Sequence, residues 1–242
     1  MPKVNVLGVD FDNYSLEEFK NQFISRLNNH LSTMIVTANP EIVMLAKQDP
    51  KFMKLLQTTP DFITADGIGV VLAGKMQKTP LKERVTGYDL FTWFMQVANL
   101  RHLRVYLVGA KPEVIKAVKE KIAKDYPGIV LVGAQDGYFK DDLKTMAQKI
   151  EATKPDMVFA AVGFPRQEQL ISIMRKDNLP ALMMGVGGSF DVFSGQVKRA
   201  PEAFQKTHLE WFYRLITNPT RFKRMLALPK FIVEVEKNKK SK

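Results

Sequence analysis

Polar side chains in this sequence recur at the ends of short apolar runs, where a parallel sheet would gather them. Such runs lead into Thr37 and Asn39, Asp66, residues 135–138, Arg166 and Gln167, and Ser189 and Asp191. Because the carboxyl ends of parallel strands meet at one edge of a sheet, these groups are expected to face a common crevice. A crevice that holds carboxylates and cations suits acid–base chemistry on an anionic substrate.

Asp66 is the candidate general base. It follows the apolar residues 62–65 and precedes Gly67, so its carboxylate is expected at a partly buried turn between a strand and a helix. Desolvation would raise the pKa of such a carboxyl toward the range in which it accepts a proton. The alternative is that Asp66 caps the helix that begins at Gly67, a role that aspartate often fills. The sequence leaves both interpretations open.

Glycines gather behind the apolar run 181–184, in the stretch GVGGSFDVFSGQVKRAP of residues 185–201. Gly187 and Gly188 would allow backbone N–H groups to approach an anion at the end of a strand. The alternative is a glycine-rich turn without a ligand.

Three further positions could contact a phosphate or a nucleotide base. Residues 163–165 lead into a helix, and helix N-termini bind anions. Residues 136–138 could stack a base on Tyr138, or could form a turn with a packed aromatic ring. Arg84 lies in a polar connection, where it could hold a phosphate by charge-assisted hydrogen bonds or could be a surface charge.

Several common motifs are absent. The GxG patterns at residues 67–69 and 185–187 do not continue into the dinucleotide fingerprint, and no Walker-type phosphate loop is present. The three histidines are scattered, and the chain has no cysteine for a thiolate or a zinc–cysteine site. Asp10 and Asp12 match the DxD pattern by which many glycosyltransferases hold a divalent ion, but this short pattern is interpreted as incidental. No metal and no other cofactor is expected.

Strand and helix patterns alternate along the first 195 residues. Helical periodicity predicts amphipathic helices between short strands that are continuous apolar runs. Such runs indicate an α/β fold with an open, mostly parallel sheet covered by helices on both faces. The predicted strands are residues 4–9, 33–38, 62–65, 105–109, 129–133, 157–163 and 181–186.

The positive charge of the chain is concentrated in its C-terminal tail. Residues 196–242 contain 12 Lys and Arg against 4 Asp and Glu, so they carry +8 of the net charge of +11. An anionic partner is expected, such as phospholipid headgroups, a diphosphate or nucleic acid. Residues 208–217 and 221–228 interleave aromatic and basic residues, as helices at a membrane interface do. The alternative is that the tail packs on its own domain.

Composition sets the remaining limits. A chain of 242 residues with 45% hydrophobic content can bury a sizeable core. The absence of cysteine fits a reducing compartment, and neither a signal peptide nor a membrane-spanning apolar run is expected. The expected domains are a catalytic core of residues 1–195 and a basic helical appendage of residues 196–242.

Seven ordered blocks of this sequence resemble the WecG/TagA/CpsF family of glycosyltransferases. The resemblance extends from the N-terminus to beyond Arg224. The blocks are TANPEIVMLA (37–46), ADGIGVV (65–71), ERVTG (83–87), LVGA (107–110), DGYF (136–139), VGFPRQE (162–168) and GVGGSFDVFSGQVKRAP (185–201).

The resemblance implies a Rossmann-like core and the transfer of N-acetylmannosamine from UDP-ManNAc to the 4-hydroxyl of GlcNAc on undecaprenyl diphosphate. This reaction builds the linkage unit of wall teichoic acid, inverts the anomeric centre and is regarded as metal-independent in the family. The resemblance also implies a cytoplasmic enzyme whose C-terminal appendage docks at the inner, anionic face of the cell membrane.

Residue roles follow from the same resemblance. Asp66 is implied as the base, and Thr37, Asn39, Arg84 and Gln167 fall on other active-site positions. Arg214, Arg221 and Arg224 are the candidates for holding the diphosphate, and the hypothesis is that the tail completes the site at the membrane. Further substrate contacts are expected from Gly109, Ala110, Asp136, Gly137, Tyr138, Gly163, Phe164, Pro165, Arg166, Gly187, Gly188 and Asp191.

Two alternatives remain open. A relative with the same fold could use a different donor, such as UDP-ManNAcA or UDP-glucose, for another surface polysaccharide. A non-catalytic basic protein could instead bind anionic membrane or nucleic acid through the tail, although the blocks lie in the core and nucleic acid is not the expected partner. The apolar face of the tail could also pair with another subunit, which would give a homo-oligomer.

Overall fold

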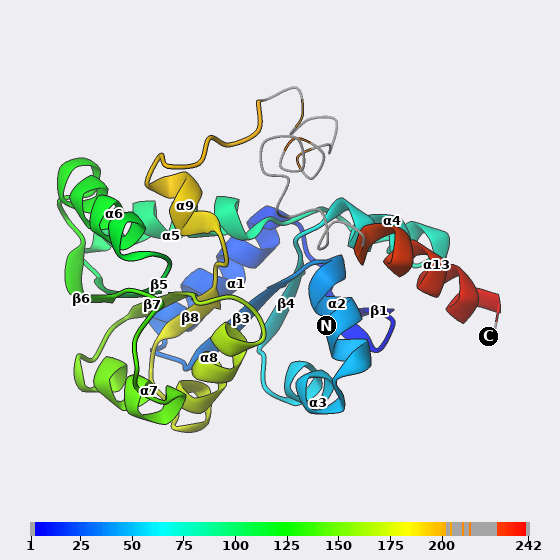
Figure 1. Ribbon diagram of the computed structural model, residues 1–242, viewed down its shortest axis with the longest axis horizontal. Coiled ribbons are helices and arrows are strands. Elements are labelled where there is room, and N and C mark those ends of the chain that lie inside the picture. The colour runs from blue at the N-terminus through cyan, green and yellow to red at the C-terminus, as the bar shows by residue number, and fades with distance from the viewer. Residues whose placement is uncertain (1–2, 202–203, 205–209, 211–212, 214–226, 241–242) are drawn as a thin grey trace.

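A parallel sheet forms the centre of the protein (Figure 1). The computed structural model describes residues 3–201, 204, 210, 213 and 227–240. The strand order is β4-β3-β8-β7-β5-β6, and every neighbouring pair is parallel. The predicted α/β fold with an open parallel sheet is therefore confirmed. The strands are β3 (Thr33–Ala38), β4 (Phe62–Ala65), β5 (Arg104–Gly109), β6 (Val130–Gln135), β7 (Met157–Ala161) and β8 (Leu182–Gly185).

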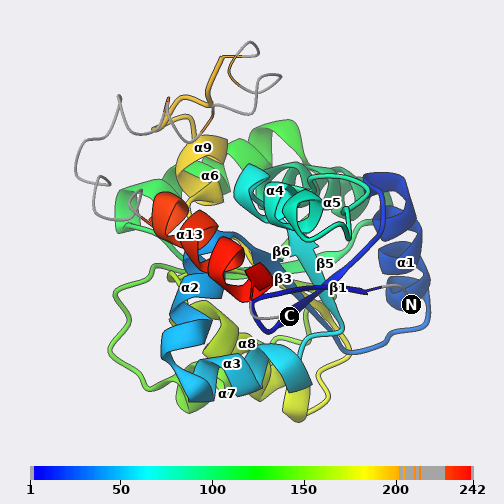
Figure 2. The same cartoon turned by 90° about the vertical axis from the view of Figure 1, so that its right-hand side faces the viewer.

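Helices cover both faces of the sheet (Figures 1 and 2). One buried apolar cluster includes side chains of α1 (Leu16–Asn28), α5 (Gly87–Arg101), α6 (Pro112–Asp125) and α9 (Ser189–Phe193). The opposite cluster includes side chains of α2 (Pro40–Gln48), α3 (Pro50–Thr58), α4 (Ile68–Met76), α7 (Leu143–Ala152), α8 (Arg166–Lys176) and α13 (Ala227–Lys240).

Strand β7 shows why the strands read as continuous apolar runs. Val158 and Ala160 belong to the cluster on one face, while Met157 and Phe159 belong to the cluster on the other. Because successive side chains of a strand point to opposite faces, a strand covered on both sides buries every residue. The sheet therefore has no solvated face along β7.

The helix boundaries agree with local sequence signals. Ser15 caps α1 in a capping box, accepting from the backbone N–H of Glu18 while the Glu18 carboxylate accepts from the backbone N–H of Ser15. Asn39 caps α2, and Pro40 occupies its first position. These signals fix the turns that follow the strands.

The N-terminal segment differs from the prediction. Residues 4–9 do not form one strand but part of an antiparallel hairpin of β1 (Lys3–Val6) and β2 (Val9–Asp12). The turn uses positive φ angles at Leu7 and Gly8, a geometry that glycine adopts readily. The hairpin packs its apolar side chains into the core cluster that includes α2 and α4.

The last helix, α13, packs on the core. Phe231 and Val235 are fully buried, and the helix contacts α2 and α4 (Figure 2). The helix α13 continues through Pro229, which lies near its start at Ala227. The helices predicted at residues 208–217 and 221–228 lie almost wholly outside the described residues.

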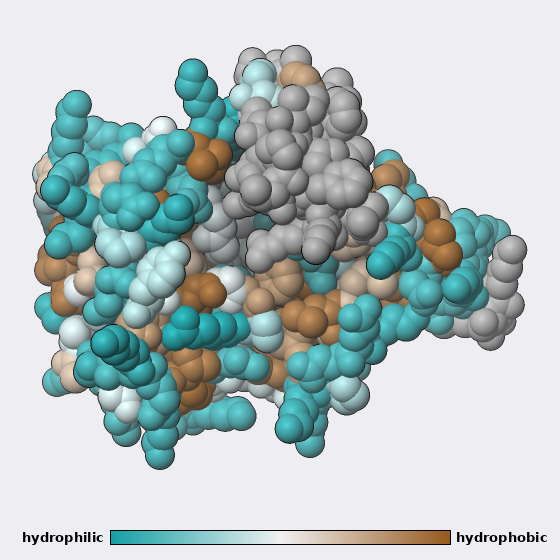
Figure 3. Space-filling view, in the orientation of Figure 1, coloured by the Kyte–Doolittle hydropathy of each residue, from teal (hydrophilic) through white to brown (hydrophobic). Residues whose placement is uncertain are grey.

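The surface in Figure 3 mixes hydrophilic and hydrophobic residues, and the outer part of the projecting α13 end is mainly hydrophilic. Within the described part of the chain, no helix combines the length and apolar character needed to cross a bilayer. The division of the chain near residue 195 stays a prediction.

Candidate active site

A cavity of about 410 Å³ opens at the carboxyl ends of β3, β4, β7 and β8. The loops that follow these strands supply most of its wall, as expected for ligand sites in open parallel sheets. All five residues predicted to be catalytic line it, as do five of those predicted to bind substrate. These ten are Thr37, Asn39, Asp66, Arg84, Gln167, Gly163, Phe164, Gly187, Gly188 and Asp191.

Asp66 and Thr37 approach each other around the first residue of α5. A Cβ atom placed on Gly87 would lie 2.9 Å from the Thr37 hydroxyl oxygen and 3.4 Å from Asp66 Oδ2. The N-cap of α4 is Gly67, which argues against the alternative that Asp66 is this cap. Asp66 is only partly buried and lines the cavity, so its carboxylate is placed to meet a ligand.

Gln167 lies beneath the glycine-rich turn after β8. Its Oε1 accepts a hydrogen bond from the backbone N–H of Gly187 at 3.3 Å. A Cβ atom on Gly185 would come within 2.5 Å of Gln167 Nε2, so the glycine makes room for the amide. Thr37 donates its hydroxyl to the Gly185 carbonyl at 3.3 Å, which links β3, β8 and α8 in one polar wall.

Glu168 is the titratable group whose environment is most perturbed beside this wall. Its side chain is 1% exposed, and burial raises the pKa of its carboxyl to about 7. Oε1 accepts from Gln167 Nε2 at 2.8 Å, whereas buried Oε2 has no partner among the described residues. Glu168 therefore fixes the orientation of the Gln167 amide, and sequence reasoning did not single it out.

Arg84 is not a surface charge. Its side chain is 18% exposed and forms an ion pair with Glu210 of the tail. Arg199 approaches the same carboxylate, with Nε at 3.8 Å from Glu210 Oε1, and lies over the ring of Tyr88. Arg199, Glu210 and Tyr88 also line the cavity.

The remaining described candidates form a second group beside the cavity, over β5, β6 and β7. Gly137 donates its backbone N–H to the Ala110 carbonyl at 2.8 Å, and Arg166 Nη1 donates to the Gly137 carbonyl at 3.1 Å. Tyr138 is 69% exposed, so its ring is open to stacking. This group comprises Gly109, Ala110, Asp136, Gly137, Tyr138, Pro165 and Arg166, and none of the seven lines the cavity itself.

The start of α4 faces the cavity, since Gly67, Ile68 and Gly69 line it, whereas Pro165 and Arg166 at the start of α8 do not. The N-cap residues of α4 and α8 are Gly67 and Pro165, and neither makes a side-chain cap hydrogen bond. In contrast, Asn39 Oδ1 accepts from the Ile42 N–H at the start of α2. An uncapped helix start can bind an anion through its backbone N–H groups, but in α8 the Gln167 N–H already donates to the Gly163 carbonyl at 2.9 Å, which leaves α4 as the better candidate.

Asp10 and Asp12 lie away from this cavity. Asp10 accepts a hydrogen bond from Asn5 inside the hairpin, and Asp12, 2% exposed, accepts the backbone N–H of Ile63. Burial raises the pKa of the Asp12 carboxyl. Among the residues that the structure describes, no cluster of three or more histidine, cysteine or acidic residues is arranged to hold a metal ion.

Sequence reasoning missed several residues of the cavity wall. Thr86 and Tyr88 follow Arg84 in the same connection, and Arg199 belongs to the block at residues 185–201 that carried the resemblance. Glu210 had no local signal, because its role depends on pairing with an arginine 126 residues away. The predicted Arg214, Arg221 and Arg224 lie outside the described residues.

Comparison with known proteins places the chain among glycosyltransferases. Residues 4–242 match the glycosyl transferase WecG/TagA/CpsF family, and the chain belongs to this family. Three relatives carry the name N-acetylglucosaminyldiphosphoundecaprenol N-acetyl-beta-D-mannosaminyltransferase. The relative from Bacillus spizizenii is 45% identical, covering 96% of this chain and 90% of its own length. The relative from Bacillus subtilis is 44% identical, covering 91% of this chain and 87% of its own length. The relative from Staphylococcus aureus is 38% identical, covering 98% of this chain and 94% of its own length.

Proposed function

We propose that this protein transfers N-acetylmannosamine to GlcNAc-diphosphoundecaprenol, a step that builds the linkage unit of wall teichoic acid. The observation that carries the proposal is the meeting of Thr37, Asn39, Asp66, Arg84 and Gln167 in one cavity at the carboxyl edge of the sheet. Full-length relatives with this activity in their names support the same reaction. The proposed donor is UDP-ManNAc.

Asp66 is the proposed general base. Its carboxylate accepts the proton of the acceptor 4-hydroxyl while that oxygen forms a bond to the anomeric carbon of the donor. The bond from this carbon to the diphosphate breaks on the opposite face, and UDP leaves with the bonding electrons. The anomeric centre is therefore inverted, and no covalent sugar–enzyme intermediate is needed.

The departing diphosphate requires positive partners. We assign this task to Arg84 and to the uncapped N-terminus of α4, since guanidinium and backbone N–H groups bind phosphate oxygens. Glu210 and Leu228 of the tail both line the cavity, which supports a role for the tail in completing the site. Arg214, Arg221 and Arg224, which lie between these two positions, are the proposed tail contacts to the diphosphate.

The second group of residues is the proposed nucleoside site. Tyr138 offers an exposed ring to a base, and Arg166 is held over Phe139 at 4.3 Å with a hydrogen bond to the Gly137 carbonyl. The Ala110 N–H bonds the carbonyl of Ala161, which lines the cavity, so the two regions are continuous. A nucleotide sugar can span them with its diphosphate in between.

The basic appendage is proposed to dock the protein at the cytoplasmic face of the membrane. Residues 196–242 carry a net charge of +8, and Lys230, Lys237 and Lys239 are exposed on α13. Anionic headgroups attract such a surface, and the lipid-linked acceptor is presented there. The proposed division of the chain into core and appendage near residue 195 has the same basis.

The experiment that tests the function measures UDP release from UDP-ManNAc with a GlcNAc-diphospholipid acceptor in the presence of EDTA. Wild type is expected to turn over, and Asp66→Asn is expected to lose about 10²–10⁴-fold in kcat, because asparagine cannot accept the proton. Thermal unfolding of both proteins checks that the variant is folded.

Other outcomes redirect the proposal. Turnover only with UDP-ManNAcA or UDP-glucose would retain the mechanism and change the donor. Turnover that EDTA abolishes and a divalent ion restores would contradict metal independence. Equal rates for wild type and Asp66→Asn would remove Asp66 from the role of base.

A further inference from the structure

Glu210 is a buried carboxylate that the tail places between two arginines. The Glu210 side chain is 9% exposed, and its Oε2 pairs with Arg84 Nη2. Arg199 Nε lies 3.8 Å from the other carboxylate oxygen. All three side chains line the cavity. One negative charge is therefore shared by two guanidinium groups in the wall of the site.

The two guanidinium groups have binding capacity that Glu210 leaves unused. Arg84 Nε is buried without a hydrogen-bond partner among the described residues. The contact from Arg199 Nε is longer than a hydrogen bond, so the attraction there is electrostatic only. An anion with more oxygens and more charge would satisfy both groups better than one carboxylate does.

Arg199 is held in place by contacts that do not involve Glu210. Its guanidinium lies 4.7 Å from the centre of the Tyr88 ring, and Nη2 donates to Asp89 Oδ1 at 2.6 Å. Asp89 is fixed in turn by the hydroxyl of Thr86 at 2.7 Å. The arginine would therefore keep its position if the carboxylate moved away.

Resting on the proposed function, we propose that Arg84 and Arg199 form a diphosphate-binding pair and that Glu210 occupies it as an internal anion until substrate arrives. The diphosphate of the nucleotide sugar displaces the carboxylate and takes its place between the two guanidinium groups. Arg199 thus becomes a substrate-binding residue, and Glu210 a competitor that substrate must displace.

The test is calorimetric titration of the full-length protein with inorganic pyrophosphate and with UDP at fixed ionic strength. Glu210→Gln keeps the size of the side chain and an acceptor oxygen but removes the competing charge, so both ligands are expected to bind about tenfold more tightly. Arg199→Gln is expected to bind both about tenfold more weakly, and Arg199→Lys to fall between, because lysine keeps the charge without the planar fork.

Matched variants control for net charge and folding. Glu234→Gln removes a tail carboxylate that pairs with Lys47 on α2, and Arg101→Gln removes an arginine that bonds Asn28. Both are expected to bind pyrophosphate as wild type does. Thermal unfolding establishes that each variant is folded, and the Arg199 variants test the pair independently of any change at Glu210.

The outcomes separate this inference from the proposed function. Unchanged or weaker pyrophosphate binding by Glu210→Gln, or unchanged binding by Arg199→Gln, would overturn the inference even if the enzyme transfers N-acetylmannosamine. Conversely, the expected pattern with pyrophosphate would support it even if another sugar is the true donor, since pyrophosphate carries no sugar. A lower kcat with an unchanged donor KM in Glu210→Gln would instead make Glu210 a positioning residue for Arg84 and would also overturn the inference.

Discussion

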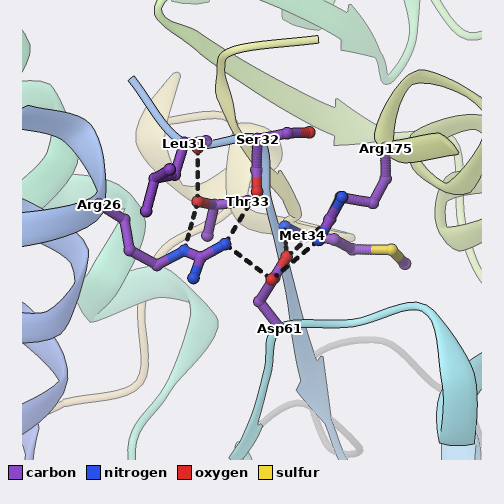
Figure 4. A network of polar contacts seen from close by, with 7 residues as sticks. All are labelled: Arg26, Leu31, Ser32, Thr33, Met34, Asp61 and Arg175. Carbon is purple, nitrogen blue, oxygen red and sulfur yellow. Dashed lines mark hydrogen bonds and ion pairs between the residues drawn. The ribbon is translucent and has the colours of Figure 1, made fainter. Parts of the chain in front are cut away.

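A carboxylate lies between two arginines at each end of the parallel strands. The amino ends of the strands are called here the amino edge of the sheet and the carboxyl ends the carboxyl edge, and the two clusters differ in how many hydrogen bonds the carboxylate accepts. At the amino edge, Asp61 accepts from Arg26 Nη2 at 2.7 Å and from Arg175 Nε at 2.8 Å (Figure 4). The backbone N–H of Met34 donates to the same carboxylate at 2.9 Å. At the carboxyl edge, Glu210 lies between Arg84 and Arg199 in the wall of the cavity.

The amino-edge cluster surrounds the Asp61 carboxylate with protein donors, although the buried hydroxyl of Ser32 has no partner among the described residues. Arg175 adds a second hydrogen bond to Asp61 through Nη2, at 3.1 Å. Arg26 also donates to the Thr33 hydroxyl at 2.7 Å and to the Ser32 carbonyl at 2.9 Å. None of these residues lines the cavity. The cluster joins the ends of α1 and α8 to the starts of β3 and β4, and its contribution is to stability.

The carboxyl edge, in contrast, contains polar atoms that the described protein does not satisfy. Arg84 Nε and Glu168 Oε2 are buried without partners among the described residues, and α4 and α8 begin without side-chain caps. Buried polar groups without partners cost free energy, and of the residues that carry such atoms in the described chain only Arg84 lines the cavity. The comparison teaches that protein groups saturate the carboxylate of Asp61, whereas Arg84, in the wall of the cavity, keeps a buried N–H that a ligand could use.

Replacement of Asp61 should give the largest loss of stability. Asp61→Ala leaves the guanidinium groups of Arg26 and Arg175 facing each other and removes the acceptor of the Met34 N–H. The expected cost is about 4 kcal/mol in the free energy of unfolding, measured with urea. Glu210→Gln is expected to cost only about 1 kcal/mol, because one neutral acceptor remains.

The second measurement on Asp61→Ala is the rate of sugar transfer per folded molecule. It should be unchanged in Asp61→Ala, since that cluster lies at the opposite edge from the cavity. A folded Asp61→Ala protein with wild-type stability and a reduced rate would contradict the division of roles between the two edges.

Much of the framework could be predicted because its signals are local. Strand β3 was predicted at its observed bounds from an apolar run, and Asn39-Pro40 is a local signal for the start of α2. Placing polar residues at strand ends located four of the five catalytic candidates, Thr37, Asn39, Asp66 and Gln167, in the cavity, whereas Arg84 was placed in the active site only by the family resemblance. Asp49-Pro50 is the same kind of local signal at the start of α3, where Asp49 accepts from the backbone N–H groups of Lys51 and Phe52.

The parts that could not be predicted depend on contacts between distant residues. Arg175 meets Asp61 across 114 positions, and Arg84 meets Glu210 across 126. A sequence shows that arginines and carboxylates are present but not which of them face each other. The hairpin was missed for another reason, since its turn at Leu7-Gly8 interrupts an apolar run without a polar residue.

The next prediction concerns Glu168. Only one of its two carboxylate oxygens has a hydrogen-bond partner among the described residues, whereas both oxygens of Asp61 accept hydrogen bonds. The folded pKa of Glu168, about 7, lies above its ordinary value of 4.5, so the folded protein holds a proton there that the unfolded chain has lost. The stability that this group contributes is present below pH 4.5 and is lost as the pH rises toward 7. The loss is on the order of 3 kcal/mol by pH 8.

Glu168→Gln should remove this dependence, since glutamine does not ionise and keeps an oxygen that accepts from Gln167. In urea unfolding, the free energy of unfolding of the variant relative to that of wild type should therefore be higher at pH 8 than at pH 5. Glu236→Gln, at an exposed position of α13, controls for the change of one charge. If the free energy of unfolding changed equally between pH 5 and pH 8 in Glu168→Gln and wild type, the carboxyl would already be ionised in the folded protein near pH 5.

The smallest expected effect concerns the start of α1, which has a full capping box and lies outside the cavity. Ser15 and Glu18 satisfy each other's backbone N–H groups at the start of α1, whereas the start of α4 lines the cavity without a side-chain cap. Ser15→Ala should cost about 1 kcal/mol in the free energy of unfolding and leave donor KM and kcat unchanged. Ser25→Ala, the same change at an exposed position of α1, should leave stability near that of wild type. A reduced kcat in Ser15→Ala at full folding would show that capped helix starts also serve the reaction, and the contrast with α4 would then lose its functional meaning.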